Sequence, residues 1–206
     1  MRDRVDRVTA TPRTARGRAT RDRILRAASQ LILQRGVAET SVDDVIERAG
    51  ASKSQLYHYF EDRDALLRAV VDHNADLVLG GLPPLDGWRA IRSWFASLVE
   101  VQQACGGCGG CPIGVLVGQF AEADEPARQR LADAFARWEA HLRAGLRSMQ
   151  LRGKLAATAD VDALATATLA SLQGGLLLTQ STRDPRRLEV ALGAAYEHLR
   201  TNGPGL

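Results

Sequence analysis

Residues 41–60, SVDDVIERAGASKSQLYHYF, decide the fold, because they predict two short helices joined by a tight Ala-Gly turn. Ser41 is placed to cap the first helix and Ser52 the second, since a serine hydroxyl accepts from the free amides at a helix start. The first helix carries an apolar stripe at helical spacing. The second is mostly polar, with Leu56 and Phe60 as its core contacts. Such a helix is poor material for a core, and its polar end suits the major groove of DNA.

Helical patterns continue on both sides of this stretch. Apolar residues recur at helical spacing over residues 20–36 and again over residues 62–80. Further helical patterns begin at Trp88, Ile113, Pro126, Asp160 and Pro185, and sustained two-residue alternation is not found. We therefore expect an all-α protein. Residues 20–66 would form a three-helix DNA-binding head with a helix-turn-helix, linked by the fourth helix to a further helical domain in residues 67–206.

The composition is that of an ordinary globular protein, with 45% hydrophobic and 25% charged residues among 206. No apolar run approaches the roughly 18 to 20 residues of a membrane span, and no apolar stretch follows the N-terminus as in a secretory signal. The expected location is the cytoplasm, without a membrane partner. Residues 1–70 hold 14 of the 27 Lys and Arg but only 10 of the 24 Asp and Glu, and a basic N-terminal third suits a polyanion.

The first 19 residues contain six arginines and little apolar content, so we expect a disordered basic arm. Two interpretations stay open for it. The arm is a solvated tail, or it touches phosphates or a minor groove of DNA.

The stretch from Thr20 to Val71 resembles the DNA-binding domain of TetR-family transcriptional regulators. The resemblance is carried by Ile-Leu with a following Ala-Ala pair, Gly36, Thr40, Ala49-Gly50, Ser52, Tyr57-His58-Tyr59-Phe60 and the Asp-Ala-Leu after them. Arg63 departs slightly from the pattern, because lysine is common there. An isolated pair of short helices would equally suit a plain helical hairpin, but that alternative leaves the polar second helix unexplained.

The resemblance implies roles that the side-chain chemistry supports. Lys53, Ser54 and Gln55 would face base edges, where lysine can pair with guanine and glutamine with adenine. The residues expected at phosphates are Thr40, Ser41, Ser52, Tyr57, His58, Tyr59 and Arg63. For His58 a partly buried ring within the fold is an equal alternative, and of the last two aromatic residues Phe60 is the better core candidate.

The C-terminal segments GGCPIGVL, FARWEAHLRAGLRSM and SLQGGLLLTQSTRDP resemble one subgroup of the same family. This implies a ligand pocket among helices and a homodimer through helices near residues 160–181 and 185–201, which would match a palindromic operator. Candidate pocket residues are Trp94, Leu98, Leu116, Gln119, Phe120, Phe135, Trp138, His141 and Gln173. The apolar ones could equally be plain core, and the polar ones are candidates for orienting a largely apolar effector.

Three cysteines, Cys105, Cys108 and Cys111, lie in a C-x2-C-x2-C pattern. They could be inert thiols, a redox switch or part of a metal site. A tetrahedral metal site would need a fourth ligand, and His73 or His141 would have to supply it, so we expect no metal and no cofactor.

The leading interpretation is a ligand-responsive repressor that binds double-stranded DNA as a homodimer and releases it when a small molecule binds. An enzyme is not expected, because paired carboxylates, a Ser/His/Asp group and a phosphate-binding glycine loop are not found. The alternative is a thiol-redox or metal sensor that uses the same DNA-binding head through its three cysteines.

Overall fold

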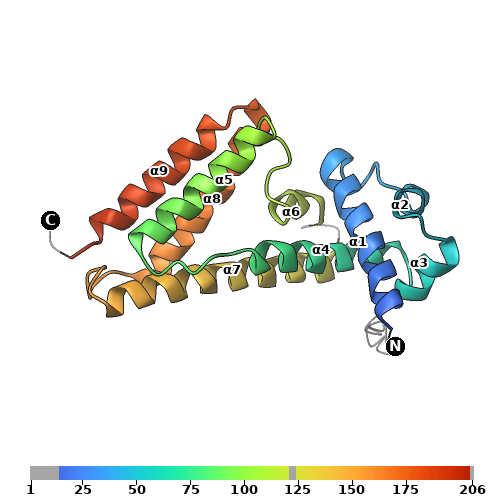
Figure 1. Cartoon of the computed structure of the whole chain (residues 1–206), viewed down its shortest axis with the longest axis horizontal. Coiled ribbons are helices and arrows are strands. Elements are labelled where there is room, and N and C mark those ends of the chain that lie inside the picture. Colours follow the sequence, from blue (N-terminus) through green and yellow to red (C-terminus); the bar gives the residue numbers. More distant parts are fainter. Residues whose placement is uncertain (1–13, 121–123, 205–206) are drawn as a thin grey trace.

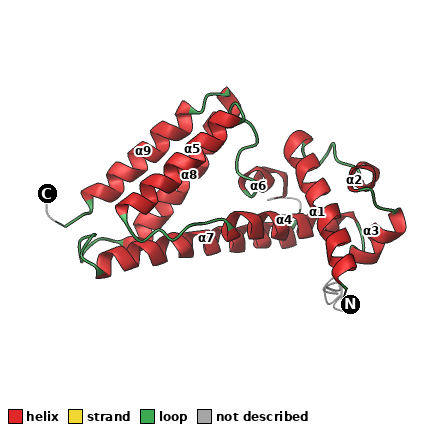
Figure 2. Ribbon diagram, in the orientation of Figure 1, coloured by secondary structure: helices red, strands yellow, loops and turns green. Residues whose placement is uncertain are grey.

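A computed structural model describes residues 14–120 and 124–204, and every regular element in these ranges is a helix (Figure 2). The all-α prediction is confirmed. In chain order the helices are α1 (Ala15–Arg35), α2 (Val42–Ala49), α3 (Lys53–Tyr59), α4 (Arg63–Gly80), α5 (Trp88–Ala104), α6 (Gly114–Phe120), α7 (Glu125–Leu151), α8 (Val161–Thr182) and α9 (Arg186–Thr201).

The helices form two groups, a head and a bundle, which are connected by the long helices α4 and α7 (Figure 1). The head consists of α1, α2 and α3, while α5, α8 and α9 form a slanted bundle at the other end of the molecule. The helices α4 and α7 run side by side and pack against each other, with α7 beneath the bundle and α4 reaching α1 of the head. Helix α4 packs against α1 of the head as well as against α7, and α7 packs against α8 of the bundle.

Helix starts follow the expected capping chemistry. The Ser41 hydroxyl accepts from the Asp44 amide, and the Ser52 hydroxyl accepts from the Gln55 amide, each within a complete capping box. Asp62 caps α4 in the same way. The predicted caps at Ser41 and Ser52 are confirmed.

Helix α1 begins earlier than expected. The Thr14 hydroxyl accepts from the Gly17 amide at 3.0 Å, so the helix starts at Ala15. Thr20 is buried, and its hydroxyl donates to the Arg16 carbonyl at 3.1 Å. Residues 15–19 are thus the first turn of α1 and no part of a disordered arm, because a capped run of alanine and arginine favours a helix. The rest of the predicted arm, residues 1–13, lies outside the described residues.

The turn between α2 and α3 depends on Gly50. Its φ of +56° lies in the left-handed region that favours glycine. The Ala51 amide donates to the Ile46 carbonyl at 3.1 Å across this turn. Leu56 and Phe60 are both completely buried, and they anchor α3 to the core of the head while the polar face of α3 stays outside.

Helices α8 and α9 form the closest pair in the bundle. A Cβ at Gly175 would lie 2.9 Å from Leu188 Cδ1, so only glycine allows this approach. By length and composition α8 could cross a membrane, contrary to our expectation that no segment comes close. In the structure α8 packs between α7 and α9 and buries nine of its residues, as a core helix does.

Candidate DNA-binding surface and effector domain

The outer face of α3 is polar and exposed. Lys53, Ser54, Gln55, Tyr57 and His58 all lie on this face and are exposed to solvent. Figure 1 shows α3 at the outer end of the head, remote from the bundle of α5, α8 and α9. The helix that was predicted to read bases is therefore presented outwards, with its first turn free of covering elements.

The first turn of α3 is held in a definite geometry. The side-chain oxygen Oε1 of Gln55 accepts from the Ser52 amide at 2.9 Å, which leaves the side-chain nitrogen Nε2 of Gln55 as a free donor. The Lys53 ammonium lies 4.0 Å from Asp43 Oδ1, and both side chains are exposed. An exposed pair of this kind contributes little, so Lys53 can exchange Asp43 for a base edge or a phosphate.

The start of α2 carries a fixed negative charge. The pKa of Asp44 is lowered to about 2, first because the Ser41 hydroxyl and then because the Ser41 amide hydrogen-bond to its carboxylate. The Arg35 guanidinium lies 2.7 Å from the same carboxylate and adds to the effect. The Ser41 hydroxyl is thus engaged within the head, and a phosphate would have to compete with Asp44 for it.

Two residues expected at phosphates turn inwards. Thr40 is 5% exposed, and its hydroxyl donates to the Gly36 carbonyl at 2.7 Å. The Arg63 guanidinium donates to the Val37 carbonyl at 2.7 Å and to the Thr40 carbonyl at 3.4 Å. These side chains order the loop between α1 and α2, because that loop has no helix partners for its carbonyls.

The aromatic residues at the end of α3 divide between surface and core. Tyr57 is 44% exposed and His58 is exposed, so the buried alternative for His58 is wrong. The Tyr59 ring is half-buried and meets the His58 ring edge-on at 5.0 Å. Phe60 is buried as expected, with the Arg21 guanidinium 5.4 Å from the centre of its ring.

A buried asparagine joins the head to the effector domain. Asn74 on α4 is 1% exposed; its Oδ1 accepts from the Ser29 hydroxyl of α1 at 2.6 Å, and its Nδ2 donates to the Pro112 carbonyl at 3.0 Å. We call Ser29, Asn74 and Pro112 the Asn74 relay. Sequence reasoning missed it, because a single asparagine in an apolar helix does not reveal its partners.

A second polar joint uses Gln119. Its Oε1 accepts from the Val37 amide of the head at 2.6 Å, and its Nε2 donates to the Val115 carbonyl at 2.9 Å. Gln119 is exposed and contacts the loop that Arg63 also holds. The structure thus places Gln119 at the contact with the head and not in a pocket, since its side-chain oxygen accepts from the Val37 amide of that loop.

A row of ion pairs ties α4 to α7. Arg130 pairs with Asp72 at 2.7 Å, and Arg137 pairs with Asp76 at 3.4 Å. These side chains are largely exposed, so the pairs contribute little individually. The two pairs follow one another along both long helices.

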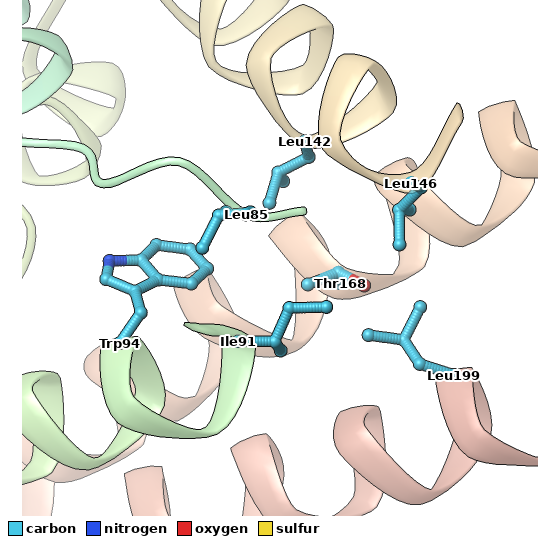
Figure 3. A pocket seen from close by; sticks show the side chains of 7 residues that line it. All are labelled: Leu85, Ile91, Trp94, Leu142, Leu146, Thr168 and Leu199. Carbon is cyan, nitrogen blue, oxygen red and sulfur yellow. The ribbon is translucent and has the colours of Figure 1, made fainter. Parts of the chain in front are cut away.

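A cavity lies inside the bundle, between α5, α7, α8, α9 and the linker before α5 (Figure 3). It is lined by Leu85, Ile91, Trp94, Leu142, Leu146, Thr168 and Leu199. Its volume is about 10 Å³, scarcely enough for one water molecule. Of the nine residues predicted for a ligand pocket, only Trp94 lines this cavity. The predicted apolar residues could not be separated from core residues, because apolar periodicity marks both alike.

The remaining predicted pocket residues have varied surroundings. Leu116, Phe120 and Trp138 are buried, and Leu98 and Phe135 are partly buried against the core. His141 Nε2 lies 2.8 Å from the Pro83 carbonyl, so this ring holds the linker between α4 and α5.

Five buried side-chain nitrogens have no hydrogen-bond partner among the described residues. Two of them belong to residues predicted for the pocket, namely the indole Nε1 of Trp138 on α7 and the side-chain amide Nε2 of Gln173 on α8. A buried polar group left unpaired costs about 1–3 kcal/mol. Such donors mark places where a bound molecule with an acceptor would gain most.

The three cysteines differ in exposure. Cys105 and Cys108 are exposed in the loop after α5, whereas Cys111 is buried. Within residues 14–120 and 124–204, no group of three or more His, Cys, Asp or Glu side chains is arranged to hold a metal ion.

Two family models match the chain. Residues 24–70 match the model of bacterial regulatory proteins of the tetR family, and residues 87–195 match the tetracyclin repressor-like C-terminal domain. An uncharacterised HTH-type transcriptional regulator of Lactococcus lactis is 29% identical over 181 residues, which cover 84% of this chain and 89% of the relative.

Further similarities agree with these models. The HTH-type transcriptional repressor DhaR of a Mycobacterium species is 23% identical over 188 residues, covering 87% of this chain and 91% of DhaR. The crystal structure of a regulatory protein TetR from Rhodobacter sphaeroides superposes with a TM-score of 0.75 at 23% identity, covering 87% of this chain and 98% of that one.

Proposed function

Since the chain belongs to the TetR family and is a DNA-binding transcriptional regulator, we propose that it is a homodimeric repressor that releases its operator when a small molecule binds. The observation that carries this proposal is the outer face of α3. Its polar side chains are exposed, while Leu56 and Phe60 fix the helix from behind. A helix held in this way can enter a major groove without rearranging the head.

The proposed base contacts are Lys53, Ser54 and Gln55. The lysine ammonium suits the O6 and N7 acceptors of guanine, and the free amide of Gln55 suits acceptors on adenine or the backbone. Tyr57, His58 and the hydroxyls of Ser41 and Ser52 would contact phosphates and fix the register. Thr40 and Arg63 would act indirectly, because they order the loop beside the start of α2.

The proposed dimer face is the outer side of α8 and α9. Leu177, Leu178 and Val190 are 66%, 53% and 69% exposed in the single chain. Large apolar side chains gathered on adjacent helices mark an association surface. A two-fold dimer through this face would present two α3 helices to the two halves of a palindromic operator.

The proposed effector is a largely apolar molecule with at least one hydrogen-bond acceptor. The cavity in the bundle is lined almost entirely by apolar side chains. Trp138 and Gln173 lie outside this lining, and their unpaired donors would reach an effector once the bundle has opened. Ligand pockets are usually roughly 300–1,000 Å³, so the bundle must open to admit an effector. The effector releases DNA only if it prefers the opened state. Since a repressor acts on the chromosome, we place the protein in the cytoplasm, where thiols stay reduced.

The DNA-binding proposal is tested by selecting binding sites from a random duplex library with the reduced protein. Lys53 and Lys154 are the two lysines of the chain, and Lys154 follows the end of α7, at the opposite end of the molecule from the head. They therefore provide a matched pair, Lys53→Ala and Lys154→Ala. We expect Lys53→Ala to lower discrimination between the selected site and a scrambled one by about 1–3 kcal/mol. If both variants behave alike, α3 does not read the bases.

The effector proposal is tested with Trp138→Phe, which removes the indole donor and keeps an aromatic ring. Compounds are first screened for release of the selected DNA. We expect Trp138→Phe to weaken binding of an active compound about tenfold or more, since a hydrogen bond to a buried donor is lost. Trp88→Phe on the partly exposed start of α5 is the control. Equal affinity in both variants would exclude Trp138 as a ligand contact.

A further inference from the structure

The loop between α5 and α6 contains a pair of thiols that the DNA-binding function does not use. Cys105 is the residue that caps the end of α5, and its Sγ accepts from the Cys108 amide at 3.1 Å. The Cys105 thiol also donates to the Cys108 carbonyl at 3.2 Å. Both cysteines are exposed, so the pair is open to small molecules in solvent.

Two glycines between the cysteines bring them together. Gly106 has a φ of +66° and Gly107 a φ of +71°, both in the left-handed region. The chain therefore folds back within four residues, and the Cys105 sulfur reaches Cys108. The hydrogen bond with the Cys105 side chain is also the main reason why the pKa of the Cys108 thiol is raised.

The same loop rests on the turn between α8 and α9. A Cβ at Gly107 would lie 3.0 Å from the backbone of Arg183, so no larger residue fits without displacing that turn. The Gly107 amide donates to the Gln102 carbonyl at 2.8 Å and ties the loop back to α5. The loop is thus held in place at Gly107, so a change in its backbone would shift its other end, at Pro112.

Cys111 is of a different kind. It is buried, and burial raises the pKa of its thiol. Thiol–disulfide exchange needs an accessible thiolate. Because Cys111 is buried whereas Cys105 and Cys108 are exposed, Cys111 is a packing residue and the reactive pair consists of Cys105 and Cys108.

We propose that Cys105 and Cys108 form a reversible intramolecular disulfide, driven by small-molecule disulfides, that weakens DNA binding through the Asn74 relay. In the first step one thiol loses its proton and attacks the external disulfide, forming a mixed disulfide and releasing one thiol. The second cysteine then loses its proton and attacks the mixed disulfide, forming the Cys105–Cys108 bond and releasing a second thiol. The pair gives up two electrons and two protons, and the external disulfide becomes two thiols.

The transmission step rests on the proposed function. The disulfide replaces the Cys105 hydrogen bonds to the Cys108 backbone, so the backbone leading to Pro112 must shift. The Pro112 carbonyl is the acceptor of Asn74 Nδ2, and Asn74 in turn holds Ser29 of α1. A shift at Pro112 therefore loosens the hold on the head, and the head samples arrangements that no longer fit the operator.

The test oxidises the full-length protein with glutathione disulfide and maps the thiols by alkylation and peptide mass spectrometry. We expect a Cys105–Cys108 disulfide in the wild type and in Cys111→Ser, and none in Cys105→Ser or Cys108→Ser. A mixed disulfide that persists on Cys108, a bridge to Cys111 or a bridge between two chains would overturn the proposed pairing.

The second measurement is the affinity for the selected DNA before and after oxidation. Oxidation is expected to raise the Kd of the wild type by about five- to 150-fold, the usual range of coupling between sites, and reduction restores it. Cys105→Ser should not respond, and Asn74→Ala should form the disulfide yet respond much less. A disulfide that leaves the Kd unchanged overturns the transmission. If the reduced protein selects no DNA, the proposed function fails, and the thiol mapping still decides the pairing.

Discussion

The Asn74 relay offers a quantitative test of how the head is held. We consider Asn74→Ala together with Ser29→Ala and the double variant. Asn74→Ala removes the partner of the Ser29 hydroxyl and the donor to the Pro112 carbonyl, both in a site where Asn74 itself is 1% exposed. The freed serine hydroxyl can turn to a carbonyl of its own helix, whereas the Pro112 carbonyl has no such choice.

The expected cost follows from these partners. A buried polar group left unpaired costs about 1–3 kcal/mol, and the deleted side chain leaves a small cavity as well. We therefore expect Asn74→Ala to lower the free energy of unfolding by about 2–4 kcal/mol. For a chain of this length, a loss of this size lowers the Tm by about 5–15 °C. Ser29→Ala should cost about 1–2 kcal/mol, because it removes one bond only.

The assay is urea unfolding of the reduced protein, followed by far-UV circular dichroism. Asn202, the second asparagine of the chain, is the matched control, since its Nδ2 donates only to the local His198 carbonyl. The double-mutant cycle should give a coupling energy of about 0.5–3 kcal/mol between Ser29 and Asn74. The reasoning is refuted if Asn74→Ala costs no more than Asn202→Ala, or if the two single effects simply add.

Four further outcomes are expected. Gln55→Ala should lower discrimination at one base pair by about 1–3 kcal/mol, measured by competition between the selected site and point variants of it; a uniform loss on all sites would contradict base reading. Tyr57→Phe should weaken binding to every sequence alike by about 0.5–1.5 kcal/mol, measured by titration of specific and random duplexes, and a loss confined to the specific site would argue against a phosphate contact. Because the pKa of Asp44 is lowered to about 2, its contribution to stability is present above about pH 4 and is lost as the pH falls towards 2; the Tm gap between wild type and Asp44→Asn should therefore close on acidification, and a constant gap would count against the capping box. Leu177→Glu should give monomers in sedimentation. Leu151→Glu changes an 82% exposed position outside the proposed dimer helices and should leave the mass unchanged. Identical masses for the two variants would exclude this dimer face.

Local signals in the sequence were enough to predict the elements of this fold. Ser41, Ser52 and Asp160 were read as helix starts because capping depends only on neighbours three residues away. The exposed tip of α3 followed from the same local reasoning, since polar residues there had no apolar stripe to join. These predictions need no knowledge of which helices meet.

Local signals could not predict which neighbours a single side chain contacts. Arg63 and Gln119 are polar residues that contact the loop between α1 and α2, and only the docking of α4 and α6 on that loop brings them there. The lining of the cavity could not be predicted for a similar reason, because it comes from four helices and a linker. Periodicity along one helix does not record which neighbours supply the remaining walls.

The length of α4 has a mechanical consequence. Its 18 residues give a rod of about 27 Å, fastened at one end to the head and along its side to α7. A tilt of about 10° at the bundle end would move the head by about 5 Å at that length. In a symmetric pair both heads move, so their spacing would change by about 10 Å against the roughly 34 Å between half-sites. In the proposed dimer, such a tilt of α4 would convert a side-chain-sized opening of the bundle into a change in spacing of about a third of a DNA turn.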